Sequence, residues 1–413
     1  MKSFLGVLLT FALIIIAQTM SGQSNQLTLS PEAEITLLTA SPGDELYSVF
    51  GHSALRVNDP QHNLDLVFNY GTFDFNTPNF YMKFARGKLM YKLTVSRMEQ
   101  FVPEYQREGR AIFEQVLNLS PAQKQKVFDF LMVNRLPENA YYHYDFFYDN
   151  CATRIRDVVE ILIEPDWPRQ TGWDEEVLAE VRSHFDYEFD YEPSMEHHRS
   201  FRDMLQPFLV NMPWSAFGID LALGLPADRT ARPWDFMYLP DEMLIAFDLA
   251  GHPNGEPLVT EHRIVIPKTQ TLSPANFFSP QKVFWLVFLI GLLSFLSPKA
   301  SFLFDRVFFT VLGITGIMVL LLWFFTDHGA TKANLNILWA VPTHLYYIWI
   351  SGKNRPLKKT YFRIISIVSV LLLILWPWIP QGYNIAFVPI ILTSIARSVP
   401  RAFEIPRLSH IVS

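Results

Sequence analysis

One cysteine, Cys151, is the strongest candidate in this chain for a chemically active side chain. It is the only cysteine among 413 residues, so no disulfide within the chain can occupy it. Asp149 or Asn150 is a suitable N-cap, and apolar residues recur at helical spacing behind it. Cys151 is therefore predicted to lie in the first turn of a helix, where the helix dipole and free N–H groups stabilise a thiolate. The alternative is a small buried apolar side chain, the usual role of an unpaired cysteine.

A thiolate nucleophile needs a base, and His52 is the strongest candidate among the eleven histidines. It follows Gly51 at the start of a predicted strand. If that strand forms a hairpin in which Val57 faces Leu64, counting back places His52 opposite Asn69 on one side of the sheet. The Asn69 amide would then hold the imidazole in one tautomer, as the third member of a catalytic set does. The alternative for His52 is a strand-end histidine bonded to the backbone.

Two other histidine groups, His143 and the pair His197-His198, are weaker candidates for a metal site. Neither has the HExxH or CxxC spacing that characterises metal sites. Solvated or capping roles explain these histidines better than metal binding does. We therefore predict no metal and no soluble cofactor.

The composition indicates membrane segments. Half of the residues are hydrophobic and 18% are charged, against about 25% charged in an ordinary soluble protein. The apolar excess is concentrated at the N-terminus and in the last third of the chain. The net charge of −6 and the absence of a long basic run argue against nucleic acid as a partner.

Residues 1–22 have the layout of a secretory signal peptide. A short basic start precedes the apolar run 4–17, and small and polar residues follow at 21–23. Because no clean A-x-A site is present, an uncleaved signal anchor is the alternative. Both interpretations send the following residues across the membrane.

Residues 23–279 have the composition of a globular α+β domain. Alternating stretches predict strands, and apolar periodicity predicts helices. The predicted strands cover 34–40, 53–57, 64–70, 88–95 and 110–119, and the predicted helices besides that of Cys151 cover 121–135, 174–185, 199–210 and 215–223.

Residues 280–400 are predicted to form an all-α domain of five transmembrane helices, followed by a cytoplasmic tail at 401–413. Ten basic residues fall in the first and third connections and in a tail counted from Arg397, whereas the second and fourth connections hold only Lys332. The positive-inside rule therefore places the N-terminal domain outside the cytoplasm. The apolar runs are 283–296, 307–325, 337–350, 364–379 and 385–396.

The order of the motifs resembles known thiol enzymes. The segment 51–53 (GHS) followed by 149–151 (DNC) resembles the circularly permuted branch of the NlpC/P60 superfamily, in which a histidine precedes a helix-borne asparagine-cysteine pair. Members of that branch, such as the lecithin–retinol acyltransferase group, move acyl chains through a cysteine thioester. This resemblance implies an antiparallel sheet with helices for the first domain.

A closer resemblance covers nearly the whole chain. The segments 69–75 (NYGTFDF), 84–88 (FARGK), 149–151 (DNC) and 326–336 (TDH to NLN) resemble the Lnb family of Bacteroidota. These are inner-membrane lipoprotein N-acyltransferases with an N-terminal periplasmic domain.

This resemblance implies that the chain is a multi-pass protein of the bacterial inner membrane. It also implies that the chain catalyses acyl transfer. Cys151 would be the nucleophile and His52 the base, a phospholipid of the bilayer would donate the acyl chain, and a diacylglyceryl apolipoprotein would accept it. The resemblance does not settle the third residue, for which Asn69 is our prediction. The residues that we predict to contact substrate are Tyr70, Arg86, Tyr144, Asn150 and Arg154.

Three alternatives stay open at this point. A membrane-anchored cell-wall peptidase or amidase of the same superfamily would use the same thiol. A non-enzymatic envelope protein that binds or assembles a partner would tolerate serine in place of Cys151. The aromatic run 141–148 either lies at the lipid interface and admits an acyl chain or supplies ordinary core side chains.

Overall fold

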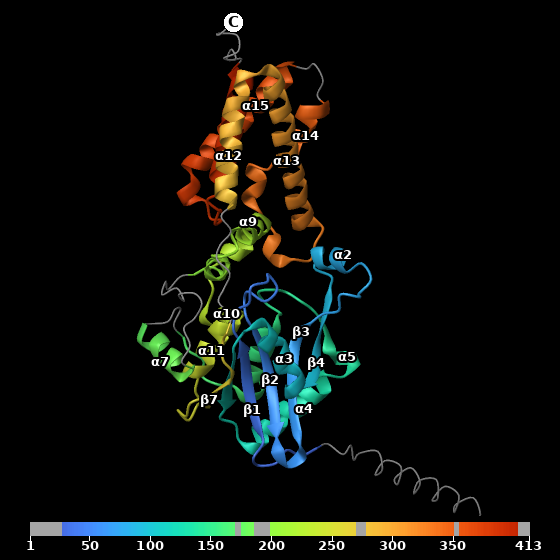
Figure 1. Cartoon of the computed structure of the whole chain (residues 1–413), viewed down its shortest axis with the longest axis vertical. Helices are drawn as coiled ribbons and strands as arrows, with labels where there is room; N and C mark the ends of the chain where they lie inside the picture. Colours follow the sequence, from blue (N-terminus) through green and yellow to red (C-terminus); the bar gives the residue numbers. More distant parts are fainter. Residues whose placement is uncertain (1–26, 170–174, 186–198, 270–277, 351–354, 404–413) are drawn as a thin grey trace, which may run out of the picture.

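The chain forms a sheet-containing domain and a helical region that extends from one end of it (Figure 1). The signal peptide predicted at the N-terminus lies outside the described residues. The computed structural model describes residues 27–169, 175–185, 199–269, 278–350 and 355–403.

Seven antiparallel strands form the sheet, in the order β6-β4-β3-β2-β1-β5-β7. All five strands predicted from alternation are present. The two strands that were not predicted are β6, which is only three residues long, and β7, an edge strand whose exposed residues disguise the pattern. The strands are β1 (Glu34–Ala40), β2 (His52–Asp59), β3 (Leu64–Thr72), β4 (Met90–Arg97), β5 (Ile112–Leu117), β6 (Tyr141–His143) and β7 (Val259–Ile266).

Helices cover both faces of the sheet. On one face α6 (Cys151–Ile163) packs on β2 and β3, with α4 (Pro121–Asn134) and α11 (Pro240–Leu249) beside it. The opposite face is covered by α3 (Met98–Glu108), because alternate strand residues enter a separate apolar cluster that contains this helix. Neither α3 nor α11 was predicted.

The other helices of this domain are short. The helix predicted at 199–210 is divided where Pro207, which has no N–H group, begins a 3₁₀ turn. These elements are η1 (Pro60–His62), α2 (Phe80–Ala85), α5 (Pro137–Ala140), α7 (Glu175–Phe185), α8 (Phe201–Leu205), η2 (Pro207–Leu209), α9 (Pro213–Ala222), η3 (Leu225–Asp228) and α10 (Pro233–Phe236).

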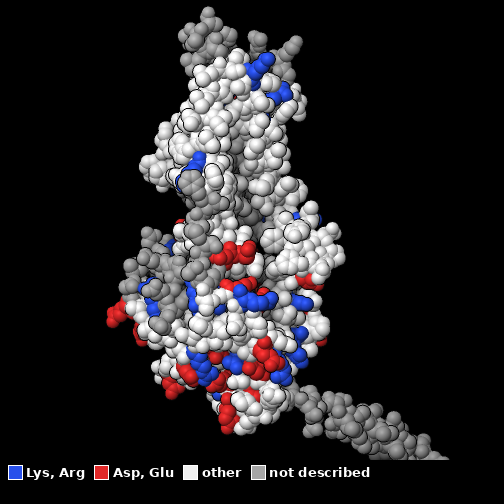
Figure 2. Space-filling model, in the orientation of Figure 1, with Lys and Arg blue, Asp and Glu red and all other residues white. Residues whose placement is uncertain are grey.

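The helical region runs alternately away from the sheet and back toward it (Figure 1). Its outer surface is mostly uncharged, whereas the charged side chains gather on the sheet domain (Figure 2). Its elements are α12 (Pro280–Leu293), η4 (Ser294–Leu296), α13 (Pro298–Phe324), η5 (Gly329–Thr331), η6 (Leu335–Leu338), α14 (Thr343–Leu345), the π-helix η7 (Tyr346–Ile350), α15 (Arg355–Ile374), η8 (Trp376–Trp378) and α16 (Phe387–Phe403).

Within the described part of the chain, one helix is long and apolar enough by itself to cross a membrane. This helix, α13, has 27 residues and is therefore about 40 Å long. The segment predicted as the third span is divided into short 3₁₀, α and π pieces around Pro342. Five transmembrane helices therefore stay a prediction.

Two of the three basic residues counted in the tail lie in a helix. Arg397 belongs to α16 and is fully buried, and its Nε donates to Oδ1 of Asp305 in α13 at 2.6 Å. Arg401 of the same helix also pairs with Asp305. These two guanidinium groups join α16 to α13.

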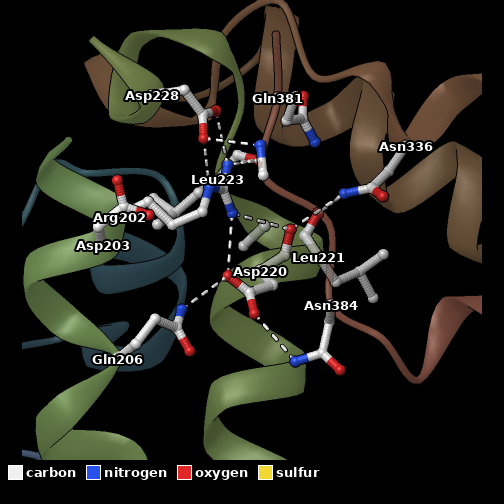
Figure 3. A network of polar contacts seen from close by, with 12 residues as sticks. Arg202, Asp203, Gln206, Asp220, Leu221, Leu223, Asp228, Asn336, Gln381 and Asn384 are labelled. Atoms are coloured by element: carbon white, nitrogen blue, oxygen red, sulfur yellow. Dashed lines mark hydrogen bonds and ion pairs between the residues drawn. The ribbon is translucent and has the colours of Figure 1, made fainter. Parts of the chain in front are cut away.

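A buried polar network joins the two parts of the molecule (Figure 3). Arg202 in α8 donates to Asp228 at 2.7 Å and to Asp220 in α9 at 3.1 Å. Asp220 in turn accepts from Asn384, and its backbone carbonyl accepts from Asn336. Because Asn336 and Asn384 belong to the helical region, the network holds that region to the sheet domain.

Candidate active site

The start of α6 presents Cys151 at one end of the sheet. Asn150 caps the helix, because its Oδ1 accepts from the Thr153 N–H at 2.9 Å while Thr153 Oγ1 accepts from the Asn150 N–H at 2.7 Å. Ile155 and Val158 are buried and fix the helix against the sheet. Cys151 is half-buried. The predicted position of Cys151 in the first helical turn is confirmed.

His52 begins β2, and its Nε2 lies 2.7 Å from Oδ1 of Asn69 in β3. The predicted register is wrong by two residues, since Val57 pairs with Leu66 and not with Leu64. A shift of two leaves every side chain on its original face of the sheet. Asn69 is therefore a diagonal neighbour of His52, close enough for the predicted contact.

The thiol and the imidazole change each other's proton affinity. Burial raises the pKa of the Cys151 thiol, but the charge and hydrogen bond of His52 and the N–H groups of Ser53 and Ala152 together lower that pKa below its ordinary value. Burial lowers the pKa of His52, while Cys151 and Asn69 raise it above its ordinary value. These opposite shifts favour a thiolate–imidazolium pair.

The Asn69 contact also assigns the two ring nitrogens of His52. Because the Asn69 carbonyl oxygen is an acceptor, Nε2 carries the proton of a neutral ring and Nδ1 is left for the sulfur of Cys151. This tautomer is the one in which the imidazole can take a proton from the thiol.

Two residues that the sequence reasoning missed surround this pair. Gly71 in β3 has a φ of +88°, and a Cβ there would lie 3.4 Å from Cβ of Cys151 and 3.9 Å from Cε1 of His52. Tyr105 from α3 stacks on the His52 ring, with centroids 6.4 Å apart. A glycine inside a strand is a signal of close approach, so Gly71 could have been found, whereas nothing local marks Tyr105.

Two tyrosines of the aromatic run form another wall of the site. Burial, followed by the charge of Cys151, raises the pKa of Tyr142 and of Tyr144, so both phenols stay protonated. The Tyr142 hydroxyl is buried, and among the described residues it has no hydrogen-bond partner. Tyr144 stacks on Tyr91, with centroids 4.2 Å apart.

The rest of the aromatic run divides between surface and core. Tyr141 and Tyr148 are exposed. Phe147 is buried and packs against Tyr238 and Phe201. The core interpretation therefore holds for Phe147, and admission of an acyl chain by this run stays a prediction.

Two of the residues predicted to contact substrate have their polar groups occupied within the protein. Tyr70 is buried, and its hydroxyl donates to Asn134 Oδ1 at 2.5 Å. The buried Asn150 donates through Nδ2 to the carbonyl groups of Phe146 and Tyr238, both at 2.8 Å. These two side chains therefore hold β3 and α6 in place.

The two predicted arginines lie in different places. Arg154 pairs with Asp149 and packs over the Tyr142 ring, 4.1 Å from its centroid. It therefore supports the wall of the site. Arg86 is exposed at the end of α2 and lies at the junction with the helical region.

One group in the described residues has the donor set of a metal site. The ligand atoms of His184, Asp248 and His262 lie within 4.8 Å of one another. The two histidines hydrogen bond the Asp248 carboxylate at 3.0 and 2.7 Å, so the carboxylate is satisfied without an ion. The group lies toward the β7 edge, separated from β2 by β1 and β5. His143 is exposed on β6, and 197–198 lie outside the described residues.

Comparison with protein-family models gives two matches. Residues 25–182 match the Lnb N-terminal periplasmic domain, and residues 272–405 match the Lnb transmembrane domain. Together they cover more than two thirds of the chain, and the first match contains Cys151, His52 and Asn69. No curated protein and no solved structure matches the chain.

Proposed function

This chain belongs to the Lnb family, with a periplasmic N-terminal domain and a transmembrane domain, and on that basis we propose that it is a lipoprotein N-acyltransferase of the inner membrane. The acyl chain passes from a phospholipid to the sulfur of Cys151. It then passes to the α-amine of a diacylglyceryl-cysteine apolipoprotein. The observation that carries the proposal is the thiol–imidazole–amide set formed by Cys151, His52 and Asn69.

In the first step the Cys151 thiolate attacks the carbonyl carbon of a phospholipid ester. The tetrahedral intermediate collapses as the ester C–O bond breaks, leaving a thioester on Cys151. The imidazolium of His52 gives its proton to the departing lysophospholipid oxygen. His52 is then neutral, as the second step requires.

In the second step the neutral α-amine of the apolipoprotein attacks the thioester carbonyl. His52 takes a proton from the nitrogen, the C–S bond breaks, and an amide remains. The thiolate and imidazolium are restored, so no external acid, base or cofactor is consumed.

Both tetrahedral intermediates carry negative charge on oxygen, and the site offers a donor for it. The Tyr142 hydroxyl keeps its proton because burial and the charge of Cys151 raise its pKa. That proton has no acceptor within the described structure. We assign it to the oxyanion, a role in which one donor contributes about 10²–10³-fold to the rate.

The principal rival is a cell-wall peptidase or amidase, which would use the same thiol and imidazole. What supports acyl transfer over that rival is the attachment of the sheet domain to the helical region by buried contacts. An enzyme that cuts murein needs only an anchor, whereas an enzyme that takes its substrate from the bilayer needs a fixed position above it.

The test is complementation of a strain that lacks its own lipoprotein N-acylation. Mass spectrometry of lipoprotein N-terminal peptides would count the acyl chains. We expect the wild type to add one amide-linked chain, and expect Cys151→Ser and His52→Ala to add none at equal expression. His62→Ala is the matched control, because His62 lies in the turn between β2 and β3.

Two results would count against the proposal. If the wild type adds no chain, the acyl-transfer proposal fails, and murein digestion becomes the assay of choice. If the two variants still acylate lipoproteins, the reaction stands but Cys151 and His52 do not perform it.

A further inference from the structure

The connection between β3 and β4 exposes an unusual amount of apolar surface. It carries the short helix α2, and four large side chains on it are turned outward: Phe75, Tyr81, Met82 and Phe84 are 67%, 80%, 62% and 53% exposed. Single exposed apolar residues are normal on a soluble surface, but a contiguous group of this size marks an interaction site. We call residues 73–88 the arm.

The arm is bonded to the outer end of α13. The backbone N–H of Asp327 donates to the carbonyl of Arg86 at 2.9 Å, and the His328 ring lies 3.1 Å from the carbonyl of Phe84. Lys88 pairs with Asp327 at 3.7 Å. Figure 1 shows α2 beside the end of α13 that faces the sheet domain. Because α13 is long and apolar enough to cross the bilayer, these bonds place the arm at the level where the membrane surface begins.

The charge of the arm suits a phospholipid surface. Lys83, Arg86 and Lys88 accompany the apolar side chains, against one acidic residue, Asp74. Apolar and aromatic side chains flanked by cations are the composition of segments that lie in the headgroup region, where the cations meet lipid phosphates. Arg86, one of the predicted substrate contacts, is exposed in this position.

We infer that the arm is immersed in the periplasmic leaflet of the bilayer and that its aromatic rings lead an acyl chain from that leaflet to Cys151. The immersion stands independently of any reaction. The route to Cys151 rests on the acyl transfer proposed above.

A continuous series of ring contacts marks the route. Phe80 contacts the exposed Phe75 with centroids 4.9 Å apart, and Phe75 contacts Phe73 at the same separation. Phe73 contacts Tyr91 at 5.3 Å, and Tyr91 stacks on Tyr144 at 4.2 Å. Tyr144 lies near the nucleophile, because the next residue, Asp145, exchanges two backbone hydrogen bonds with Asp149, which is two residues before Cys151.

The series therefore begins at the membrane and ends beside the nucleophile. An acyl chain that follows it stays against apolar ring faces and does not have to cross water with its ester. Two of these rings, Phe73 and Phe80, also pack against the main apolar core. This packing holds the arm in place where it projects from the sheet.

The immersion is tested with a single cysteine introduced into Cys151→Ser protein. Met82→Cys is labelled with an environment-sensitive fluorophore, and the full chain is placed in nanodiscs of phosphatidylethanolamine and phosphatidylglycerol. We expect strong quenching by brominated acyl chains at this position. Gln61→Cys, in the turn at the far end of the hairpin of β2 and β3, is the control and is expected to stay unquenched.

Equal and weak quenching at both positions would overturn the immersion. So would efficient disulfide cross-linking of Met82→Cys between two copies, because the apolar side chains would then be covered by a second chain and not by lipid.

The route is tested by the triple substitution Phe75→Ser, Tyr81→Ser and Phe84→Ser, which changes only exposed side chains of the arm and includes one ring of the series. We expect at least a tenfold loss of acyl transfer from long-chain phospholipid in vesicles. Alkylation of Cys151 by iodoacetamide and deacylation of a short-chain, water-soluble ester should be unchanged.

The outcomes separate the two proposals. Unchanged transfer from vesicles would refute the route while acyl transfer itself stands. A wild type that transfers no acyl chain from either donor would refute the proposed function, and the quenching result would still decide the immersion. Loss of iodoacetamide alkylation as well would show that the substitutions damage the site, which contradicts a role confined to lipid entry.

Discussion

Removal of the Asn69 side chain should raise the pH at which Cys151 becomes a nucleophile. In the structure the Asn69 carbonyl oxygen accepts from His52 Nε2 at 2.7 Å, and this bond contributes to the raised pKa of the imidazole. A hydrogen bond to a charged group contributes about 1.5–3 kcal/mol. We use the lower end, about 1.5 kcal/mol, because the pair is only half-buried, and that equals about one pKa unit.

The sign of the effect follows from the coupling between the two groups. Without Asn69 the pKa of His52 falls, so less imidazolium is present to stabilise the thiolate. The pKa of Cys151, which His52 holds below its ordinary value, therefore rises. The thiolate is present above the pKa of Cys151 and is lost as the pH falls through it. Asn69→Ala should thus shift the pH profile upward by about one unit and slow alkylation about tenfold on its acidic side.

The assay measures the rate of Cys151 alkylation by iodoacetamide between pH 4 and pH 10 in detergent. Because the chain has no other thiol, all alkylation of cysteine reports on Cys151. Asn69→Asp is the matched control, since it keeps an oxygen at the same position and should leave the midpoint at or below that of the wild type. An Asn69→Ala profile that superimposes on the wild-type profile would refute the assignment of Asn69 as the residue that orients His52.

Two further predictions concern the oxyanion and the junction. Tyr142→Phe should reduce acyl transfer about 10²-fold and leave iodoacetamide alkylation unchanged, since alkylation forms no oxyanion; undiminished transfer would exclude the hydroxyl as a donor. Arg202→Met leaves Asp220 and Asp228 buried without their cation and should lower the free energy of unfolding by about 3–5 kcal/mol, seen as a lower midpoint of thermal unfolding in detergent. Arg229→Met, which removes a partly exposed cation, should have a much smaller effect, and equal midpoints for both variants would contradict the structural role of the network.

Local sequence patterns predict most strands of the sheet but not the register in which the strands pair. Alternation of apolar and polar residues places β1 at 34–40, as the structure has it. Alternation predicts a longer loop between β2 and β3, because it stops at Val57 and begins again at Leu64. In the structure Asp59 pairs with Leu64, and Asn63 adopts a left-handed conformation with a φ of 51° that closes the turn sooner. That conformation depends on the folded hairpin, and nothing in the alternation reveals it.

In the candidate site, too, local sequence places some residues, whereas contacts between distant segments place others. Cys151 could be placed because the capping residues and helical period are contiguous in sequence. Tyr142 and Tyr105 could not, since they reach the site through contacts between distant segments: β6 pairs with β4, and α3 packs on the face that carries His52. Sequence reasoning assigned Tyr70 and Asn150 to substrate because they flank motif residues, whereas burial assigns them to the protein interior.

The attachments between the sheet domain and the helical region include two at separate points, and together they fix the position of Cys151 relative to that region. A single contact would act as a hinge and let the domain tilt over the membrane. The arm is bonded to Asp327 and His328 just beyond the end of α13, while Asp220, which Arg202 holds, accepts hydrogen bonds from Asn336 and Asn384 farther along the chain. Two attachments at separate points prevent that tilt. A thiolate that takes an ester from a leaflet must meet it at one height, since a misplacement of about 1 Å can cost about 10²-fold in rate. The buried network is therefore as much a condition of the proposed reaction as the imidazole that activates the sulfur.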